Sequence, residues 1–204
     1  MTAEPTKGER TRKKLVDTTA ALLRSQGYHA TGLSEIVAAS GAPRGSLYFY
    51  FPGGKDDLAI AALAASSDAW CARIQAMVAA APDLGAALEA IVTAIADELE
   101  ASGWVHGCPV AAVALEATSE PVRAAIAAHF QRWIELSVAH LTSLGMARQP
   151  ARELSLVAVS ALEGALLTAR ALRSREPLRA VGRTLRAMAQ LAMPPAPAPR
   201  KKSR

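Results

Sequence analysis

Several side chains between residues 31 and 55 have the chemistry needed to bind a polyanion. Arg44 offers a planar guanidinium that can pair with two acceptors on a guanine edge or hold a phosphate through a charge-assisted fork. Tyr48 and Tyr50 add hydroxyl groups that can reach phosphate and rings that can touch thymine methyl groups. Lys55 stands where a helix is expected to begin, so its ammonium and the helix N-terminal N–H groups can face one phosphate. This combination is typical of a surface that contacts nucleic acid.

Two short helices around a glycine turn would position these side chains. We expect helices over residues 33–39 and 43–50, joined at Gly41, which tolerates the positive φ that a tight turn requires. Leu47 and Phe51 are spaced to turn back toward the first helix, which leaves the other face of the second helix exposed. This arrangement is the helix-turn-helix unit, whose second helix lies in the DNA major groove. The residues predicted on this basis to contact DNA are Arg44, Gly45, Ser46, Tyr48, Tyr50 and Lys55.

The positive charge of the chain is concentrated near its two ends. Residues 7–55 contain eight Lys and Arg against three Asp and Glu, and residues 175–204 contain eight against one. The formal net charge of +5 therefore conceals an acidic middle. A basic N-terminal module on an acidic body suits the binding of nucleic acid by one end of the molecule.

Two groups of basic residues have alternative interpretations. Arg10, Arg12, Lys13 and Lys14 either position the protein on phosphates or are simply solvated. The basic residues of 200–204 either add non-specific DNA affinity through counterion release or only keep the chain soluble.

Composition favours an all-α protein of about nine helices. Hydrophobic residues make up 51% of the 204 residues and aromatic residues only 4%, while Ala, the best helix former, is abundant. We expect a three-helix DNA-binding domain over residues 1–54, a helical bundle for effector binding and dimerisation over 55–193, and a disordered Pro-rich basic tail over 194–204. Two cysteines cannot form a disulfide framework, and neither a secretion signal nor a membrane-spanning apolar run is evident. These features predict a soluble cytoplasmic protein.

Bulky side chains in the Ala-rich C-terminal half either fill its core or surround a cavity. Large groups interleaved with small ones can leave space between helices, which is a usual place for a ligand. A largely apolar small molecule would suit a pocket near Trp104, Cys108 and Trp133. The residues predicted to line this pocket are Trp70, Met77, Ile91, Ile95, Trp104, His106, Cys108, Phe130, Trp133 and Leu162.

The sequence offers no constellation for catalysis or for a metal. His106 and Cys108 could suggest a metal site. His129 and His140, however, lie eleven residues apart on one expected helix, which separates them by about 16 Å, too far to bind one ion. No basic residue adjoins Cys108, so a redox-sensing thiolate is not favoured. Residues 53–55 lack the spacing of a phosphate loop. We therefore predict that the protein is not an enzyme and needs no metal or cofactor.

Two C-terminal helices have apolar faces that suit a four-helix bundle across a two-fold axis. The helix expected over 150–173 carries small residues that allow close approach, and the helix expected over 177–193 carries a Leu, Val and Met stripe. Packing within one chain is the alternative, but one DNA-binding module reads too few bases to bind tightly, which favours a dimer. The residues predicted at the dimer interface are Leu156, Ser160, Gly164, Leu167, Leu178, Val181, Leu185 and Met188.

The chain resembles the TetR family of bacterial transcriptional regulators. The resemblance rests on Gly27-Tyr28, Ile36, Ser40-Gly41-Ala42, Gly45-Ser46-Leu47-Tyr48, Phe51 and Lys55. Residues 51–59 and 107–117 resemble the subgroup of LmrA- and YxaF-type repressors. The family often has Ser or Thr at the position of Gly32, and we assign the missing hydroxyl's role at DNA to Thr31 or Ser34.

This resemblance implies a homodimer that represses a neighbouring gene at a palindromic double-stranded operator until a small molecule binds the C-terminal half. Such an effector would favour a dimer whose DNA-binding units no longer match the ~34–36 Å spacing of consecutive grooves. The helix expected over 55–80 is the predicted carrier of that change, and no membrane partner is expected. The alternative is a ligand-independent dimeric DNA-binding protein whose C-terminal half only dimerises.

Overall fold

The computed structural model describes residues 4–117 and 119–193, and these residues form nine helices and no strand. This confirms the prediction of an all-α fold with about nine helices. The predicted tail over 194–204 lies outside the described residues. The helices are α1 (Lys7–Ala30), α2 (Leu33–Ser40), α3 (Arg44–Tyr50), α4 (Lys55–Ala80), α5 (Leu84–Ala101), α6 (Pro109–Ala114), α7 (Glu120–Ser143), α8 (Arg148–Leu172) and α9 (Glu176–Ala192).

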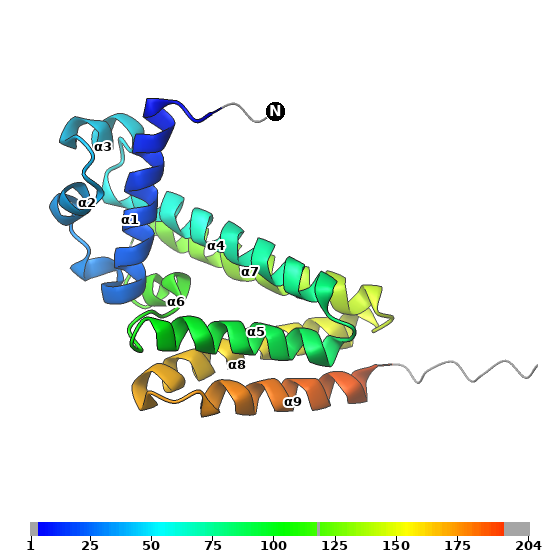
Figure 1. Ribbon diagram of the computed structural model, residues 1–204. Helices are drawn as coiled ribbons and strands as arrows, with labels where there is room; N and C mark the ends of the chain where they lie inside the picture. Colours follow the sequence, from blue (N-terminus) through cyan, green and yellow to red (C-terminus); the bar gives the residue numbers. More distant parts are fainter. Residues whose placement is uncertain (1–3, 118, 194–204) are drawn as a thin grey trace, which may run out of the picture.

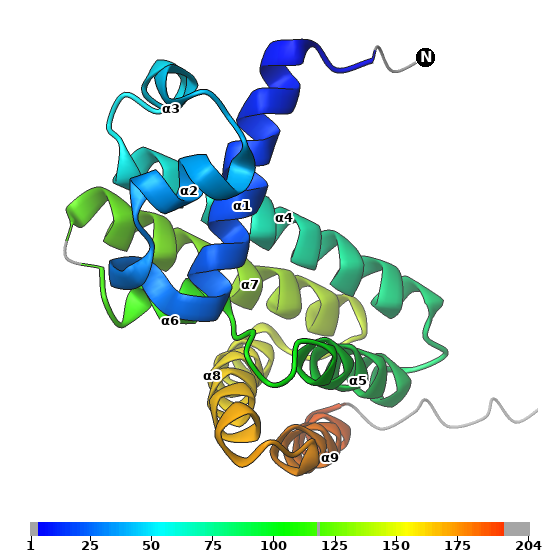
Figure 2. The same cartoon turned by 60° about the vertical axis from the view of Figure 1, so that its left-hand side comes forward.

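The N-terminal helices and the last two helices lie on opposite sides of the molecule. α1, α2 and α3 form a unit at one end, from which α4 leads into the helical body (Figure 1). α4 runs beside α7, α7 packs on α8, and α9 packs on both α5 and α8. The turned view in Figure 2 shows α8 and α9 along the side of the body remote from α3.

The first helix is capped at its start and bent near its end. The Glu9 N–H donates to the Thr6 hydroxyl at 3.2 Å, and the Glu9 carboxylate accepts the Thr6 N–H at 2.7 Å, so the first turn is capped reciprocally. α1 bends at Gly27, which has a φ of 81°, and then continues to Ala30. Glycine suits the bend because residues with a side chain rarely adopt this positive φ, and a Cβ there would also displace the carboxylate of Glu116.

One hydrophobic core joins the N-terminal helices to the body. It contains Leu15 of α1, Leu47 of α3, Leu58 of α4, Val113 of α6 and Val122 of α7, all almost completely buried. Full burial of one such side chain contributes about 1.5–3 kcal/mol relative to exposure. Because these side chains pack together, a shift of α4 or α6 would displace the N-terminal helices that share this core.

Proline positions account for two helix starts that differ from expectation. α8 begins at Arg148 rather than at Pro150, and Pro43 precedes α3 as its N-cap instead of opening it. A proline lacks only an N–H that the first turn leaves unpaired, so it is tolerated anywhere in that turn and does not fix the first residue.

Candidate DNA interface and internal cavity

The turn between α2 and α3 holds α3 through its inward side chains. Gly41 ends α2 in the left-handed conformation, with a φ of 63°, and Pro43 caps α3. Ile36, Leu47 and Phe51 are all buried in one hydrophobic core, and α3 packs on α1. Among the other side chains of α3, those of Arg44, Tyr48 and Phe49 are exposed, as the helix-turn-helix prediction requires.

The outer surface of α3 is more apolar than predicted. Arg44 and Gly45 are exposed, Ser46 is half-buried, and Tyr48 is 53% exposed. Phe49, which is absent from the predicted contacts, is 78% exposed. An exposed Phe beside an exposed Tyr forms an apolar patch of the kind that marks a binding surface. The clue in the sequence was the run of four aromatic residues from Tyr48 to Phe51.

Gly45 is not required by the fold of the single chain. No atom lies within 4 Å of the place that a Cβ at Gly45 would occupy. Glycine inside a helix costs about 1 kcal/mol relative to Ala, so a glycine without a local steric reason calls for an external one. Close approach of a partner's backbone to α3, as predicted for DNA, is such a reason.

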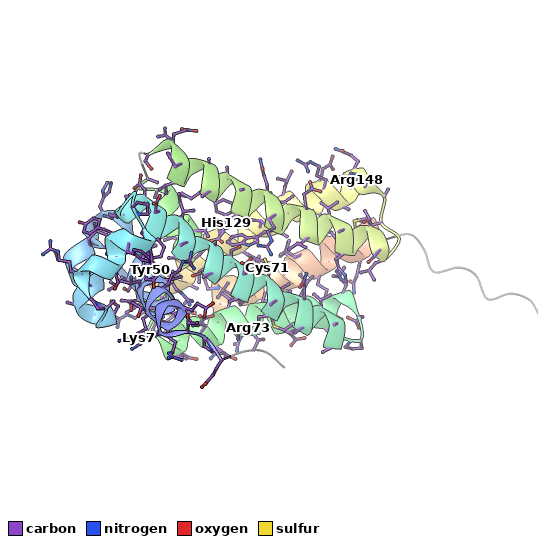
Figure 3. All side chains as sticks on the ribbon, turned by 90° about the horizontal axis from the view of Figure 1, so that it is seen from above. Lys7, Tyr50, Cys71, Arg73, His129 and Arg148 are labelled. Atoms are coloured by element: carbon purple, nitrogen blue, oxygen red, sulfur yellow. The ribbon has the colours of Figure 1, made fainter. Side chains whose placement is uncertain are left out.

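Tyr50 is a packing residue as much as a surface residue. It is half-buried, and its hydroxyl would lie only 2.7 Å from a Cβ placed at Gly8 in the first turn of α1. Figure 3 shows Tyr50 close to the start of α1 at Lys7. Its ring also packs edge-on against Phe49, with centroids 4.9 Å apart. Tyr50 therefore links α3 to the basic start of α1, and its contact with DNA remains a prediction.

The assignment of Thr31 to DNA is corrected. Thr31 is buried, and its hydroxyl donates to the carbonyl oxygen of Gly27 at 2.6 Å, so it closes the bent end of α1. Ser34 is exposed in the first turn of α2 and keeps its predicted role. Gly32 caps α2 without a side-chain hydrogen bond, which leaves the first N–H groups of α2 available to a phosphate.

Lys55 is tied to the end of α1. Its Nζ lies 4.3 Å from the centre of the Tyr28 ring and 3.5 Å from the carbonyl oxygen of His29. Burial lowers the pKa of Lys55, although Glu116 and Asp56 act in the opposite direction. The Tyr28 hydroxyl in turn donates to Asp56. Lys55 thus joins the start of α4 to α1, and its contact with a phosphate remains a prediction.

The bases at the start of α1 are exposed but not equivalent. Lys13 pairs with Asp17 at 2.5 Å, and the Arg12 guanidinium lies 5.4 Å from the centre of the Phe51 ring. Lys14 is exposed and forms no ion pair with any other described residue. Arg10 donates to the carbonyl oxygen of Pro5 at 2.5 Å, so Lys14 is the base in this group with the fewest contacts.

A cavity of about 1060 Å³ lies between the helices of the body. Residues of α1, α4, α5, α7, α8 and α9 line it, together with the loop before α6 and the first turn of α6. Most of these side chains are apolar, and the volume is at the upper end of the roughly 300–1,000 Å³ of ligand pockets. Seven of the ten predicted residues line it, namely Trp70, Ile91, Ile95, His106, Cys108, Trp133 and Leu162.

Three residues predicted to line the cavity lie elsewhere. Phe130 packs edge-on against Trp133 at 5.3 Å, within the core that joins the N-terminal helices to the body. Trp104 has a φ of 66° and lines a separate groove beside the start of α9. Met77 is half-buried on α4 but does not reach the cavity, whereas the adjacent Val78 does. Helical spacing alone could not separate these positions.

The cavity also contains charged residues that were not predicted. Arg24 and Arg73 both pair with Glu98, at 2.5 Å and 3.3 Å. Glu163 of α8 forms no ion pair with any other described residue, and burial raises the pKa of its carboxyl group. Burial, reinforced by Glu163, also raises the pKa of the adjacent Cys108 thiol, which therefore stays protonated.

The predicted dimer residues of α9 are corrected in part. Leu178 and Leu185 are buried against other helices of the same chain, and Val181 is half-buried in the same two clusters. Their periodic spacing identified an apolar stripe, but this stripe packs within the chain. On α9 only Met188 of the predicted set is exposed, and it is joined by Leu191, which is 88% exposed.

The predicted dimer residues of α8 lie on the exposed surface of that helix. Leu156, Ser160, Gly164 and Leu167 are all exposed along it. Among the described residues, six of the twelve exposed large hydrophobic side chains lie on α8 and α9. α8 alone of the described helices is long and apolar enough to cross a membrane by length and composition, but it packs on α7 and α9. Leu156 and Leu167 therefore remain exposed to solvent in the single chain.

Comparison with known proteins gives this architecture a family. Residues 15–62 match the tetR family of bacterial regulatory proteins, and residues 85–184 match the C-terminal domain of LmrA/YxaF-like transcriptional regulators. An uncharacterised HTH-type transcriptional regulator of Mycobacterium tuberculosis is 38% identical over 182 residues, covering 86% of this chain and 92% of that protein. YxaF of Bacillus subtilis, also an uncharacterised regulator, is 33% identical, covering 82% of this chain and 88% of its own.

A solved structure supports the same fold. The TetR-family transcriptional regulator of Cytophaga hutchinsonii superposes with a TM-score of 0.79 at 22% identity, covering 94% of this chain and 98% of that chain. The chain belongs to the TetR family of bacterial transcriptional regulators, which confirms the resemblance. It is a DNA-binding transcriptional regulator and not an enzyme, with a C-terminal domain of the LmrA/YxaF-like type.

Proposed function

We propose that this protein is a homodimeric repressor that leaves a palindromic operator when a small, largely apolar molecule binds in the cavity. TetR-family regulators bind operator DNA and act as dimers. Each protomer would place the exposed face of α3, with Arg44 and Tyr48, in one of two major grooves ~34–36 Å apart. The two-fold symmetry of the dimer requires the palindrome. Its place of action would be the cytoplasm.

The observation that carries this proposal is a short connection between the cavity and the end of α1. Cys108 lines the cavity and caps α6, its sulfur accepting the N–H of Ala111 at 3.5 Å. Glu116, just beyond the six residues of α6, accepts the N–H of His29 at 2.6 Å. A displacement of the cavity wall at Cys108 would therefore reach α1, and with it α2 and α3, through one short helix.

α4 supplies a second route to the DNA-binding helices. Its 26 residues extend for about 39 Å. Trp70 and Cys71, beyond its midpoint, line the cavity, while Lys55 at its start contacts Tyr28 of α1. A small rotation of α4 about the cavity would move its other end and change the separation of the two α3 helices in the dimer.

Dimerisation through α8 and α9 would satisfy their exposed apolar face. Small residues such as Ser160 and Gly164 lie between Leu156 and Leu167, so two copies of α8 can approach closely across a two-fold axis. This face lies away from α3, which leaves both copies of α3 accessible to one DNA duplex.

The proposal is tested with an operator selected from random duplexes and with ligands found by thermal shift. We expect the selected sequence to be palindromic and bound by two protomers, and we expect hits to weaken operator binding in fluorescence anisotropy. An Ala158→Trp variant, which takes up part of the cavity, should bind the operator but show a smaller thermal shift. Hits that stabilise the protein without weakening operator binding would contradict ligand-controlled repression. They would favour the ligand-independent alternative.

A further inference from the structure

Resting on the proposed function, we propose that the cavity takes an organic cation, an apolar ring-containing molecule with one positively charged nitrogen that pairs with Glu163. The ring system would occupy the apolar part of the cavity, between side chains such as Ile91, Ile95 and Leu162. The charged nitrogen would lie at the carboxyl group of Glu163, close to Cys108.

Glu163 is the one charged residue in the described cavity lining that has no ion-pair partner. Asp17 pairs with Lys13 at 2.5 Å, and Arg24 and Arg73 share Glu98. Glu163 forms no ion pair within the part of the chain that the structure describes. The two histidines of the lining, His106 and His140, do not pair with it either. One negative site is thus left for a ligand to satisfy.

Burial raises the free energy of the ionised, unpaired Glu163 side chain. A carboxylate in apolar surroundings loses its hydration and regains little from neutral neighbours, and burial accordingly raises the pKa of Glu163. Cys108 is its polar neighbour, and a thiol is a weak hydrogen-bond donor. A bound cation would supply the missing charge and a strong hydrogen bond together. Because a cation offsets the free-energy cost of burying this carboxylate, the cavity should bind positively charged ligands in preference to neutral ones.

The same inventory bears on other ligand charges. An anion would have to compete with Glu98 for Arg24 and Arg73, although these two arginines share that one carboxylate and the Nε of Arg24 has no hydrogen-bond partner among the described residues. A neutral ligand would leave Glu163 as it is and would gain only apolar contact. Trp133 also lines the cavity, with its Nε1–H held by the Ser67 hydroxyl at 2.9 Å, and an indole ring attracts cations.

The position of Glu163 also connects this ligand class to regulation. A cation that draws the Glu163 carboxyl group toward itself takes it away from Cys108, which caps α6. α6 leads to Glu116 and the end of α1, as described above. Charge recognition and the proposed signal to α1 therefore begin at the same side chain.

The experiment uses matched ligands on one frame and measures binding directly. Naphthalene and biphenyl, each carrying an aminomethyl, a hydroxymethyl or a carboxylate group, are titrated into the full chain by calorimetry at neutral pH. We expect the amine to bind about tenfold or more tightly than the alcohol on the same frame, with the carboxylate weakest. Glu163→Gln should abolish the preference of amine over alcohol. Glu153→Gln, at an exposed position of α8 outside the cavity, should retain it.

Each result bears on the inference separately from the proposed function. Equal binding of amine and alcohol, preferential binding of the carboxylate, absence of binding by every amine, or an unchanged preference in Glu163→Gln would overturn the cation assignment. Operator release is measured in parallel by anisotropy. Amine binding without operator release would support the ligand class and contradict the repressor proposal. Operator release by the alcohols alone would support the repressor proposal and contradict the ligand class. Circular dichroism confirms that Glu163→Gln folds, and the preference of the wild-type chain decides the matter if it does not.

Discussion

The DNA surface and the cavity are assembled in opposite ways. The candidate DNA contacts lie within one continuous stretch, from Ser34 in α2 through α3 to Lys55 at the start of α4, and the buried residues that orient them are their close neighbours. The cavity gathers residues from Asp17 of α1 to Ala189 of α9. Local spacing determines which residues α3 exposes, whereas the packing of most of the chain determines what lines the cavity. A single substitution should therefore act more strongly and more selectively at α3 than in the cavity.

The largest effect is expected at Arg44. If the guanidinium reads a base, Arg44→Ala costs about 1–3 kcal/mol in each protomer, so operator affinity of the dimer falls roughly 30-fold or more. Anisotropy titrations at one salt concentration measure this change. Arg148→Ala, at the far end of the molecule from α3 (Figure 3), serves as the control and should bind normally. Equal affinity of wild type and Arg44→Ala would remove α3 from its assigned role.

Next in size is the effect of a charge on the exposed face of α8. Leu167→Asp would place a carboxylate in each half of the proposed interface, where desolvation costs several kcal/mol. Sedimentation should then show monomers at concentrations at which the wild type is dimeric. Leu115→Asp, at another strongly exposed leucine, tests the specificity of the change and should leave the dimer intact. A dimer that survives Leu167→Asp would place the interface elsewhere.

A smaller effect is expected from the pH dependence of stability at Glu163. Its pKa is raised above 4.5 in the folded chain, so the folded state holds this proton more tightly than the unfolded state does. As pH rises from about 4.5 through the raised pKa, the wild type should lose stability relative to Glu163→Gln. Urea denaturation between pH 4 and pH 8 measures the difference. Parallel curves for the two proteins would show that burial does not penalise this carboxylate.

The smallest effect is expected at Lys14. If its exposed ammonium contacts a phosphate, Lys14→Ala should lower the slope of log affinity against log salt by about 0.9 per protomer and weaken all DNA sequences alike. Titrations over a series of salt concentrations give the slope. An unchanged slope would mean that this base is simply solvated, which was the alternative left open by the sequence.

The sequence predicted the fold and the turn and buried positions of the helix-turn-helix because these depend on local patterns. Gly41, Leu47 and Phe51 occupy the turn and buried positions that their types and spacing indicated. The prediction that Thr31 contacts DNA was wrong because the burial of Thr31 depends on the bend at Gly27. That bend lies against Glu116, which is far along the chain. A contact of that kind leaves no mark in the spacing of nearby residues.

The body was predicted less well for the same physical reason. Leu178 and Leu185 form a regular apolar stripe, but periodicity does not tell whether a stripe packs on its own chain or on a partner. Glu163 looks like an ordinary exposed acid among small residues of α8, and only the packed structure reveals that it is half-buried in the wall of the cavity. The composition suggested that a cavity exists, but tertiary packing determines which charged side chains line it.

The distance between the two DNA-binding units tests most directly whether the cavity controls them. A spin label on an unnatural ketone-bearing residue at exposed position 38 of α2 leaves Cys71 and Cys108 untouched. Pulsed electron resonance then compares the dimer bound to operator with the dimer bound to the tightest-binding amine of the naphthalene and biphenyl series. We predict a narrow distance in the operator complex and a different mean distance in the amine complex. The same distance in both complexes, with operator released, would contradict control of the DNA-binding units by the cavity.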